Sequence, residues 1–229
     1  GEVVDTYQVS DVNINKVATA MVGRSPSTFY NRERTDRGET VLEVKSLSRQ
    51  GVVRDVSFDV RRGEVFGIGG MVGAGRTELM SLIFGSDHYD EGSILIDGQK
   101  LQPKSPRDAI DAGICMIVED RQTFGLFMDR PVCENISIVH NEKKGLLLDR
   151  KEEQDLVNNV LDRFDIVTAG PQQLAGYLSG GNQQKALVAR WFLLDTKVYI
   201  FDEPTKGVDI GAKEEIYEFI VELAKNGKA

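Results

Sequence analysis

The run Gly-Met-Val-Gly-Ala-Gly-Arg-Thr at 70–77 combines residue types whose spacing suits the binding of phosphate. The apolar segment 64–69 before it predicts a strand, and the segment 77–84 after it predicts a helix. Glycines let successive backbone N–H groups turn inward around an anion, and the positive end of the helix points to the same place. Thr77 supplies the hydroxyl that such loops place on Mg²⁺, whereas Arg76 stands where the motif has lysine.

Two carboxylates, Asp202 and Glu203, directly follow the apolar segment 197–201. A strand that ends there would place both at the carboxyl edge of a parallel sheet, where ligands bind. Asp202 is then expected to hold Mg²⁺, and Glu203 to orient or deprotonate an attacking water. A solvated acidic turn would contain the same two residues, so this pair alone does not decide between the two readings.

A third pattern, Leu-Ser-Gly-Gly-Asn-Gln-Gln-Lys, occupies residues 178–185. Ser179 and two glycines at the start of an expected helix make an anion site from bare backbone N–H groups and the helix dipole. An ordinary capped helix end explains Ser179, but it does not explain two glycines, each of which costs about 1 kcal/mol of helix propensity relative to alanine.

Hydrophobic periodicity predicts the elements that position these patterns. Ile14, Val17, Ala18, Met21 and Val22 share one helical face, and Gly23 is placed to end that helix. Residues 121–178 lack strong strand runs and read as a helical insertion. The alternation of strands and helices predicts an α/β sheet. The strands are expected at 41–44, 52–60, 93–96, 114–118 and 197–201, and further helices at 105–112, 151–164, 179–194 and 212–224.

Composition bounds the class of protein. The 229 residues include 36 acidic and 28 basic side chains, a net charge of −8, which argues against a surface that coats nucleic acid. Two cysteines, Cys115 and Cys133, do not indicate a disulfide framework, and Cys115 lies in an apolar run that favours a buried, inert thiol. No run approaches the ~20 apolar residues of a membrane span, so we expect a soluble, cytoplasmic protein.

Residues 178–185 resemble the signature motif of ABC-transporter ATP-binding domains, in the form used by bacterial monosaccharide importers. Residues 73–79 resemble the phosphate loop of the second ATP-binding domain in those tandem proteins. Residues 119–121 with Gly125-Leu126, and residues 202–209, resemble further motifs of the same family, and residues 21–24 resemble the segment that joins its two domains. The resemblance runs along essentially the whole chain in the right order.

The resemblance implies a P-loop NTPase fold with a RecA-like core, an antiparallel β subdomain and an inserted helical subdomain at about 121–178. Residues 1–38 would be the end of a preceding domain and a linker, and residues 39–229 an ATP-binding domain truncated at its C-terminus. The family imports ribose, galactose, xylose and related sugars, with ATP and Mg²⁺ as cofactors. The implied partners are the first ATP-binding domain, membrane permease subunits and, indirectly, an extracytoplasmic sugar-binding protein, at the cytoplasmic face of the inner membrane.

In this family each ATP lies between the phosphate loop of one domain and the signature of the other. The implied catalytic residue is Glu203, the implied Mg²⁺ ligands are Thr77 and Asp202, and the sensing segment and domain interface would use Glu119 and Asp209. The implied nucleotide-binding residues are Gly70, Met71, Val72, Gly73, Ala74, Gly75, Arg76, Thr77 and Glu78. The implied signature residues, which would complete the partner's site, are Leu178, Ser179, Gly180, Gly181, Asn182 and Gln183.

Two departures from the family pattern bear on activity. Arg76 replaces the usual lysine, and its planar fork differs from an ammonium group; Glu119 replaces the usual glutamine of the sensing segment. No aromatic residue that could stack on adenine occurs between Leu47 and Arg54, and the strand and switch residue expected after the last helix are absent. The site on this domain's own phosphate loop is therefore expected to be weak, and the signature half intact.

Two alternatives remain open from the sequence. One is a nucleotide-binding, allosteric half without turnover, which the departures at 76 and 119 favour over an autonomous ATPase. The other is a soluble ABC ATPase that acts on nucleic acid or the ribosome, which the acidic balance and the form of the signature oppose.

Overall fold

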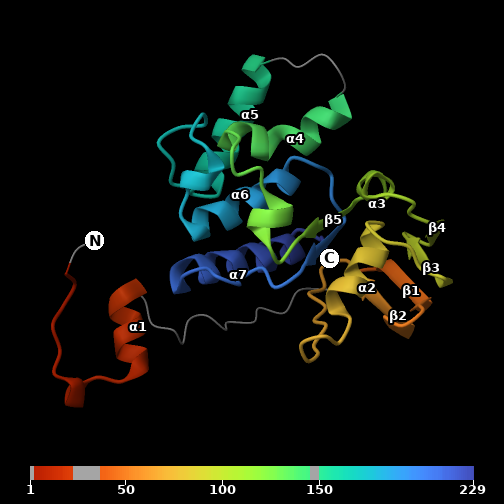
Figure 1. Ribbon diagram of the computed structural model, residues 1–229, viewed down its shortest axis with the longest axis horizontal. Helices are drawn as coiled ribbons and strands as arrows, with labels where there is room; N and C mark the ends of the chain where they lie inside the picture. Colours follow the sequence, from red (N-terminus) through yellow and green to blue (C-terminus); the bar gives the residue numbers. More distant parts are fainter. Residues whose placement is uncertain (1–2, 23–36, 145–149) are drawn as a thin grey trace.

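The computed structural model describes residues 3–22, 37–144 and 150–229 (Figure 1). The predicted helix stop at Gly23 and most of the proposed linker lie outside these residues. The predicted N-terminal helix is present as α1 (Ile14–Val22), preceded by a short 3₁₀ turn, η1 (Val9–Asp11). None of the helices in the described part of the chain is long and apolar enough to cross a membrane.

Four strands form an antiparallel sheet in the order β2-β1-β3-β4. The long hairpin of β1 (Thr40–Arg49) and β2 (Val53–Arg61) pairs Val44 with Phe58 and Leu42 with Val60. β3 (Glu91–Ile96) lies on the other side of β1, and β4 (Gln99–Leu101) extends the edge through a tight turn. The predicted antiparallel β subdomain is thus confirmed, with β4 as a strand that periodicity did not predict.

A second, parallel sheet pairs β5 (Ile114–Ile117) with β6 (Val198–Phe201). The prediction of a strand at 64–69 is wrong, because this segment has no ladder partner among the described strands. A cavity of about 380 Å³ separates residues 64–68 from β6. The edge of β6 away from β5 instead meets the chain end, where Tyr199 N donates to Ala229 O at 2.7 Å and Ala229 N donates to Lys197 O at 2.9 Å.

Most helices lie on the side of the parallel pair away from the antiparallel sheet (Figure 1), but residues 76–84 and 106–112 form helices that pack beside that sheet. Ser105 and Asp108 form a capping box at the start of α3, and Gly113, in the left-handed region, ends it. The described residues between 121 and 178 form helices joined by loops, with one isolated bridge between Pro131 and Leu174. The helices are α2 (Arg76–Phe84), α3 (Pro106–Ala112), the π-turn η3 (Arg121–Gly125), α4 (Val132–Lys144), α5 (Arg150–Arg163), the 3₁₀ turn η4 (Ala175–Tyr177), α6 (Gly180–Phe192) and α7 (Ile210–Lys225).

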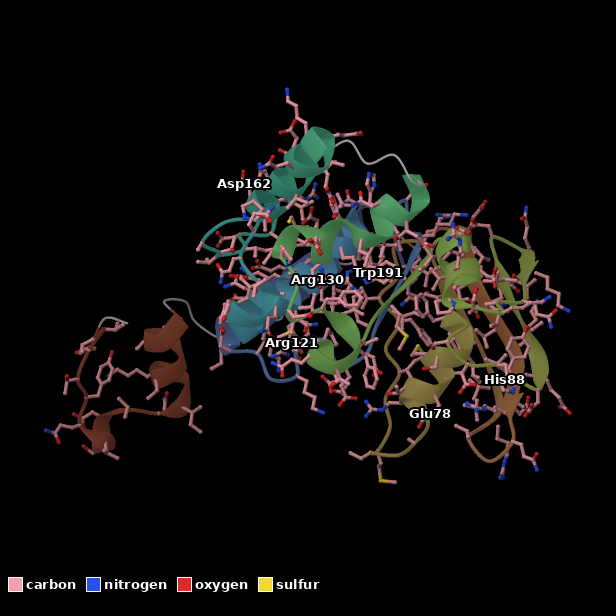
Figure 2. The ribbon with its side chains drawn as sticks, turned by 45° about the horizontal axis from the view of Figure 1, so that its top comes forward. Glu78, His88, Arg121, Arg130, Asp162 and Trp191 are labelled. Carbon is pink, nitrogen blue, oxygen red and sulfur yellow. The ribbon has the colours of Figure 1, made fainter. Side chains whose placement is uncertain are left out.

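Helix α6 contributes to two hydrophobic clusters of the core, one among the helices and one against the parallel sheet. One face packs on α4 and α5 through Ala186 and Ala189, and another face packs on the parallel sheet through Leu187 and Val188. Trp191 lies near the middle of the side-chain view (Figure 2). Its ring packs in a T-shaped arrangement with the ring of Phe84 from α2, and the two ring centroids are 6.1 Å apart. The start of α6 is therefore fixed relative to both the helical part and the strands that carry the candidate site.

Gly92 of β3 lies against the bulge of β1, and this contact leads to a prediction about stability. Its φ is +105°, and an added Cβ would lie 2.6 Å from the carbonyl oxygens of Lys45 and Ser46. Gly92→Ala is therefore expected to lower the free energy of unfolding by about 2–4 kcal/mol in urea denaturation. The matched control is Gly98→Ala, which also has positive φ (+73°) but meets nothing within 4 Å and should cost about 1 kcal/mol. Equal losses for the two variants would contradict the packing argument.

Candidate functional site

The predicted phosphate loop joins the segment 64–69 to α2. Gly73 and Gly75 have φ of +79° and +82°, conformations that suit glycine, and Ala74 N donates to Met71 O at 3.0 Å. Gly75 is the residue before α2 and has no side chain to cap it, so the first turn presents N–H groups to an anion. Met71 and Val72 project into solvent, and Glu78 lies exposed in the first turn of α2 (Figure 2).

An ion pair brings the phosphate loop to the end of β6. Arg76 Nη1 donates to Glu203 Oε1 at 2.8 Å across 127 positions of sequence. Glu203 has φ of +47°, which is uncommon for a residue with a side chain and marks a constrained turn. Both side chains are part-exposed, at 30% and 46%, so the pair contributes little to folding and its interest is positional.

Asp202 is suited to hold a cation. Its residue is 7% exposed, and its Oδ2 is buried without a hydrogen-bond partner among the described residues. A buried carboxylate oxygen without a partner is costly unless a ligand satisfies it, and hard divalent cations prefer oxygen donors. The exposed hydroxyl residue Thr77 lies in the first turn of α2, the helix that begins with Arg76. Asp202 therefore fits the predicted role in Mg²⁺ binding.

Glu119, the unusual acid of the sensing segment, forms an ion pair with Lys206. The hydrogen bond from Lys206 to Glu119 raises the pKa of the Lys206 ammonium, and the nearby charges of Glu203 and Asp120 act in the same direction. Asp120 caps the turn η3 by accepting from the backbone N–H groups of Gln122 and Thr123. Lys206 thus offsets a group of carboxylates beside the phosphate loop.

The signature residues gather at the start of α6. Ser179 caps the helix, with its exposed Oγ 3.3 Å from Asn182 N and 2.9 Å from Asn182 Nδ2. Gln183 is buried and donates to the carbonyls of Leu178 and Ala175. The phosphate loop and this helix start lie on different sides of the molecule (Figure 1). The structure thus forms two separate clusters, one around Arg76 and Glu203 and one around Ser179.

Asp209 links the second cluster to α7. Its side chain caps α7 by accepting from Ala212 N at 2.9 Å. An added Cβ on Gly181 would lie 2.8 Å from Ala212 Cβ and 3.4 Å from Asp209 Oδ2, so glycine is required for this contact. The role of Asp209 in facing a partner domain stays a prediction.

Comparison with known proteins identifies the family. The sequence profile described as ABC transporter matches residues 53–206, which is more than half of the chain. The chain belongs to the ABC transporter family.

Relatives agree over the full length of the chain. It is 44% identical to the ribose import ATP-binding protein RbsA of Bacillus licheniformis over 232 residues, which cover 100% of this chain and 47% of the relative. It is 42% identical to a putative ribose/galactose/methyl galactoside import ATP-binding protein of Geobacillus kaustophilus, with coverage of 100% and 46%. The chain thus spans about half the length of the curated relatives it matches.

Solved structures share the fold. A structure described as MJ1267, an ATP-binding cassette of an ABC transporter, matches with a TM-score of 0.71 at 23% identity, covering 83% of this chain and 79% of that one. The structure of cbiO1 from Clostridium perfringens matches with a TM-score of 0.67 at 24% identity, covering 82% and 75%. The predicted fold class of an ABC ATPase, a P-loop NTPase, is confirmed.

Sequence reasoning assigned no role to two residues that organise the candidate site, Lys206 and Arg121. Lys206 was noted only as part of the motif at 202–209 and given no role, although its charge, opposite to that of Glu119, was an available signal. Arg121 was noted as part of a motif but given no role, and its contacts with backbone carbonyls leave no trace in the sequence.

The Glu119–Lys206 pair makes a prediction about nucleotide affinity. Lys206→Gln should raise the dissociation constant for ATP about threefold, because the carboxylates beside the phosphate loop lose their counter-charge. The double variant Glu119→Gln/Lys206→Gln should return to within about twofold of the original value. Titration calorimetry with ATP measures both, and Lys100→Gln, at an exposed position on β4, is the matched control. Additive effects of the two substitutions would contradict the pairing.

Proposed function

We propose that this chain is the second ATP-binding domain of a tandem ATP-binding protein that energises import of a simple sugar. The observation that carries the proposal is 40–45% identity along nearly all of the chain to proteins named for ribose import. Because the chain spans about half of those relatives, we assign the other half to a first ATP-binding domain. Residues 1–38 then form the end of that domain and a linker, and residues 39–229 form the second domain, with its helical subdomain at about 121–178.

Each cluster of the site contributes half of a composite nucleotide site. Residues 70–78 bind the phosphates of one ATP, while Thr77 and Asp202 hold Mg²⁺, which neutralises charge on those phosphates when bound. Glu203 orients the attacking water and accepts its proton. Residues 178–183 present the N-terminal end of α6 and the Ser179 hydroxyl to the nucleotide held by the first domain. The two clusters share no residues and lie apart in the structure, which supports the assignment of each cluster to a different nucleotide.

The Arg76–Glu203 ion pair favours a second candidate, a nucleotide-binding half without turnover. While Arg76 holds Glu203, that carboxylate is directed at a cation rather than at a water. ATP phosphates would compete with Glu203 for the guanidinium, so the site alternates between the ion pair and the bound nucleotide. The weak catalytic competence expected from the sequence then has a structural cause.

We assign the protein to the cytoplasmic face of the inner membrane as a peripheral subunit. Attachment through permease subunits is supported by the relatives' names, which describe import ATP-binding proteins. An extracytoplasmic sugar-binding protein acts through the same permease and selects the sugar.

The division of labour predicts unequal effects of two substitutions in the full-length tandem protein. Ser179→Arg places a long cation where the partner nucleotide binds and should lower kcat for ATP hydrolysis to less than about one tenth. Arg76→Ala affects the weaker site and should lower kcat by less than about threefold. A phosphate-release assay measures both, with Ser86→Arg, an exposed serine after α2, as the control. The reverse ranking would overturn the division.

The second candidate predicts that this 229-residue chain binds ATP but does not turn it over. Calorimetry should detect binding of ATP, while phosphate release should stay below about one hundredth of the rate of the tandem protein, because the catalytic glutamate is held and the partner signature is missing. Turnover near that of the tandem protein would contradict the binding-only candidate.

A further inference from the structure

Arg121 contacts two other segments of the chain with one side chain, the loop after β6 and the start of α6. Its Nη1 donates to the carbonyl of Lys206 at 2.9 Å and its Nη2 to the carbonyl of Gly207 at 3.1 Å. Its Nε lies 3.3 Å from Oε1 of the buried Gln183, in the first turns of α6. Arg121 itself begins the π-turn η3, beside the ion pair of Glu119. Figure 2 shows Arg121 next to α6, and Arg130 lies further along the same connection.

The space around the guanidinium is closely filled. An added Cβ on Gly180 would lie 2.9 Å from Arg121 Nη2 and 3.1 Å from the carbonyl oxygen of Gly207. An added Cβ on Gly207, which has φ of +66°, would lie 3.6 Å from the same nitrogen. Gly180 therefore permits the close approach of Arg121 and of the loop after β6, whereas Gly207 is favoured by its positive φ and its added Cβ would make only an ordinary contact with the guanidinium.

We propose that Arg121 is a positioning residue that fastens the loop 203–209 to the start of α6, and so sets Glu203 and Ser179 relative to each other. The inference rests on the proposed function, in which these two residues serve different nucleotides. Arg121 touches backbone carbonyls and Gln183, so it acts through the loop and the helix rather than on a nucleotide. A planar fork with donors to two successive carbonyls is specific to arginine, and a lysine ammonium cannot replace it.

The test compares Arg121→Lys with the unaltered full-length tandem protein. We expect kcat for ATP hydrolysis to fall about tenfold or more, with KM for ATP unchanged within about twofold, because misplaced catalytic groups affect turnover more than binding. Hydrogen exchange should quicken in peptides that contain residues 203–209 and 179–183. Peptides from the β1–β3 sheet should exchange as before, which separates loss of positioning from loss of the fold.

Arg130→Lys is the matched control, because it makes the same change at an exposed arginine of the same connection. It should leave kcat, KM and exchange unchanged. The inference is overturned if Arg121→Lys keeps kcat within about twofold, if it raises KM alone, or if exchange quickens equally in all peptides. Absence of ATP hydrolysis in the unaltered tandem protein would instead overturn the proposed function, while the exchange comparison would still decide whether Arg121 fastens the loop.

Discussion

The loop between β6 and α7 is held at several points, and the rest of the site takes its position from it. At its start Glu203 pairs with Arg76 of the phosphate loop. In its middle, residues 206–207 are held by Glu119 and Arg121 of the sensing segment. At its end the cap of α7 lies against the start of α6. These partners come from three different segments. A shift of the loop would therefore change its contacts with the phosphate loop, the sensing segment and the signature at the same time.

The charges of the site balance within this arrangement. Asp202, Glu203 and Glu119 would repel one another if they were gathered without counter-charges, and a phosphate would add to that repulsion. Arg76 and Lys206 each pair with one of the acids. The two departures from the family pattern, Arg76 and Glu119, are therefore both partners in ion pairs with residues of the same loop. They are better understood as one rearranged set of charges than as two independent losses.

The sequence predicted elements whose signals are local. Helices α3 and α6 have their caps within a few residues, at Ser105 and Ser179, so their starts could be read from neighbouring residue types. The prediction of a strand at 64–69 was wrong because a strand needs a second strand to pair with, and a local sequence pattern does not show whether one is present. Helix α4 falls within the predicted helical insertion, but its bounds were not predicted; its fully buried Asn135, satisfied by the backbone of Phe127, is a polar residue at a core position. The motif residues were found, but the contacts of Arg121 over 62 to 86 positions were not, because backbone carbonyls carry no sequence signal.

The two glycines of the signature show why a motif can be specific without having a single cause. In the sequence they suggested an anion site, because bare N–H groups at a helix start bind phosphate and glycine is otherwise costly there. In the structure Gly180 also makes room for Arg121, and Gly181 for Ala212. Packing alone would therefore exclude a larger residue at both positions. The exposed Ser179 hydroxyl likewise has a structural role, because it caps α6, so each residue of the motif serves the local structure as well as any bound nucleotide.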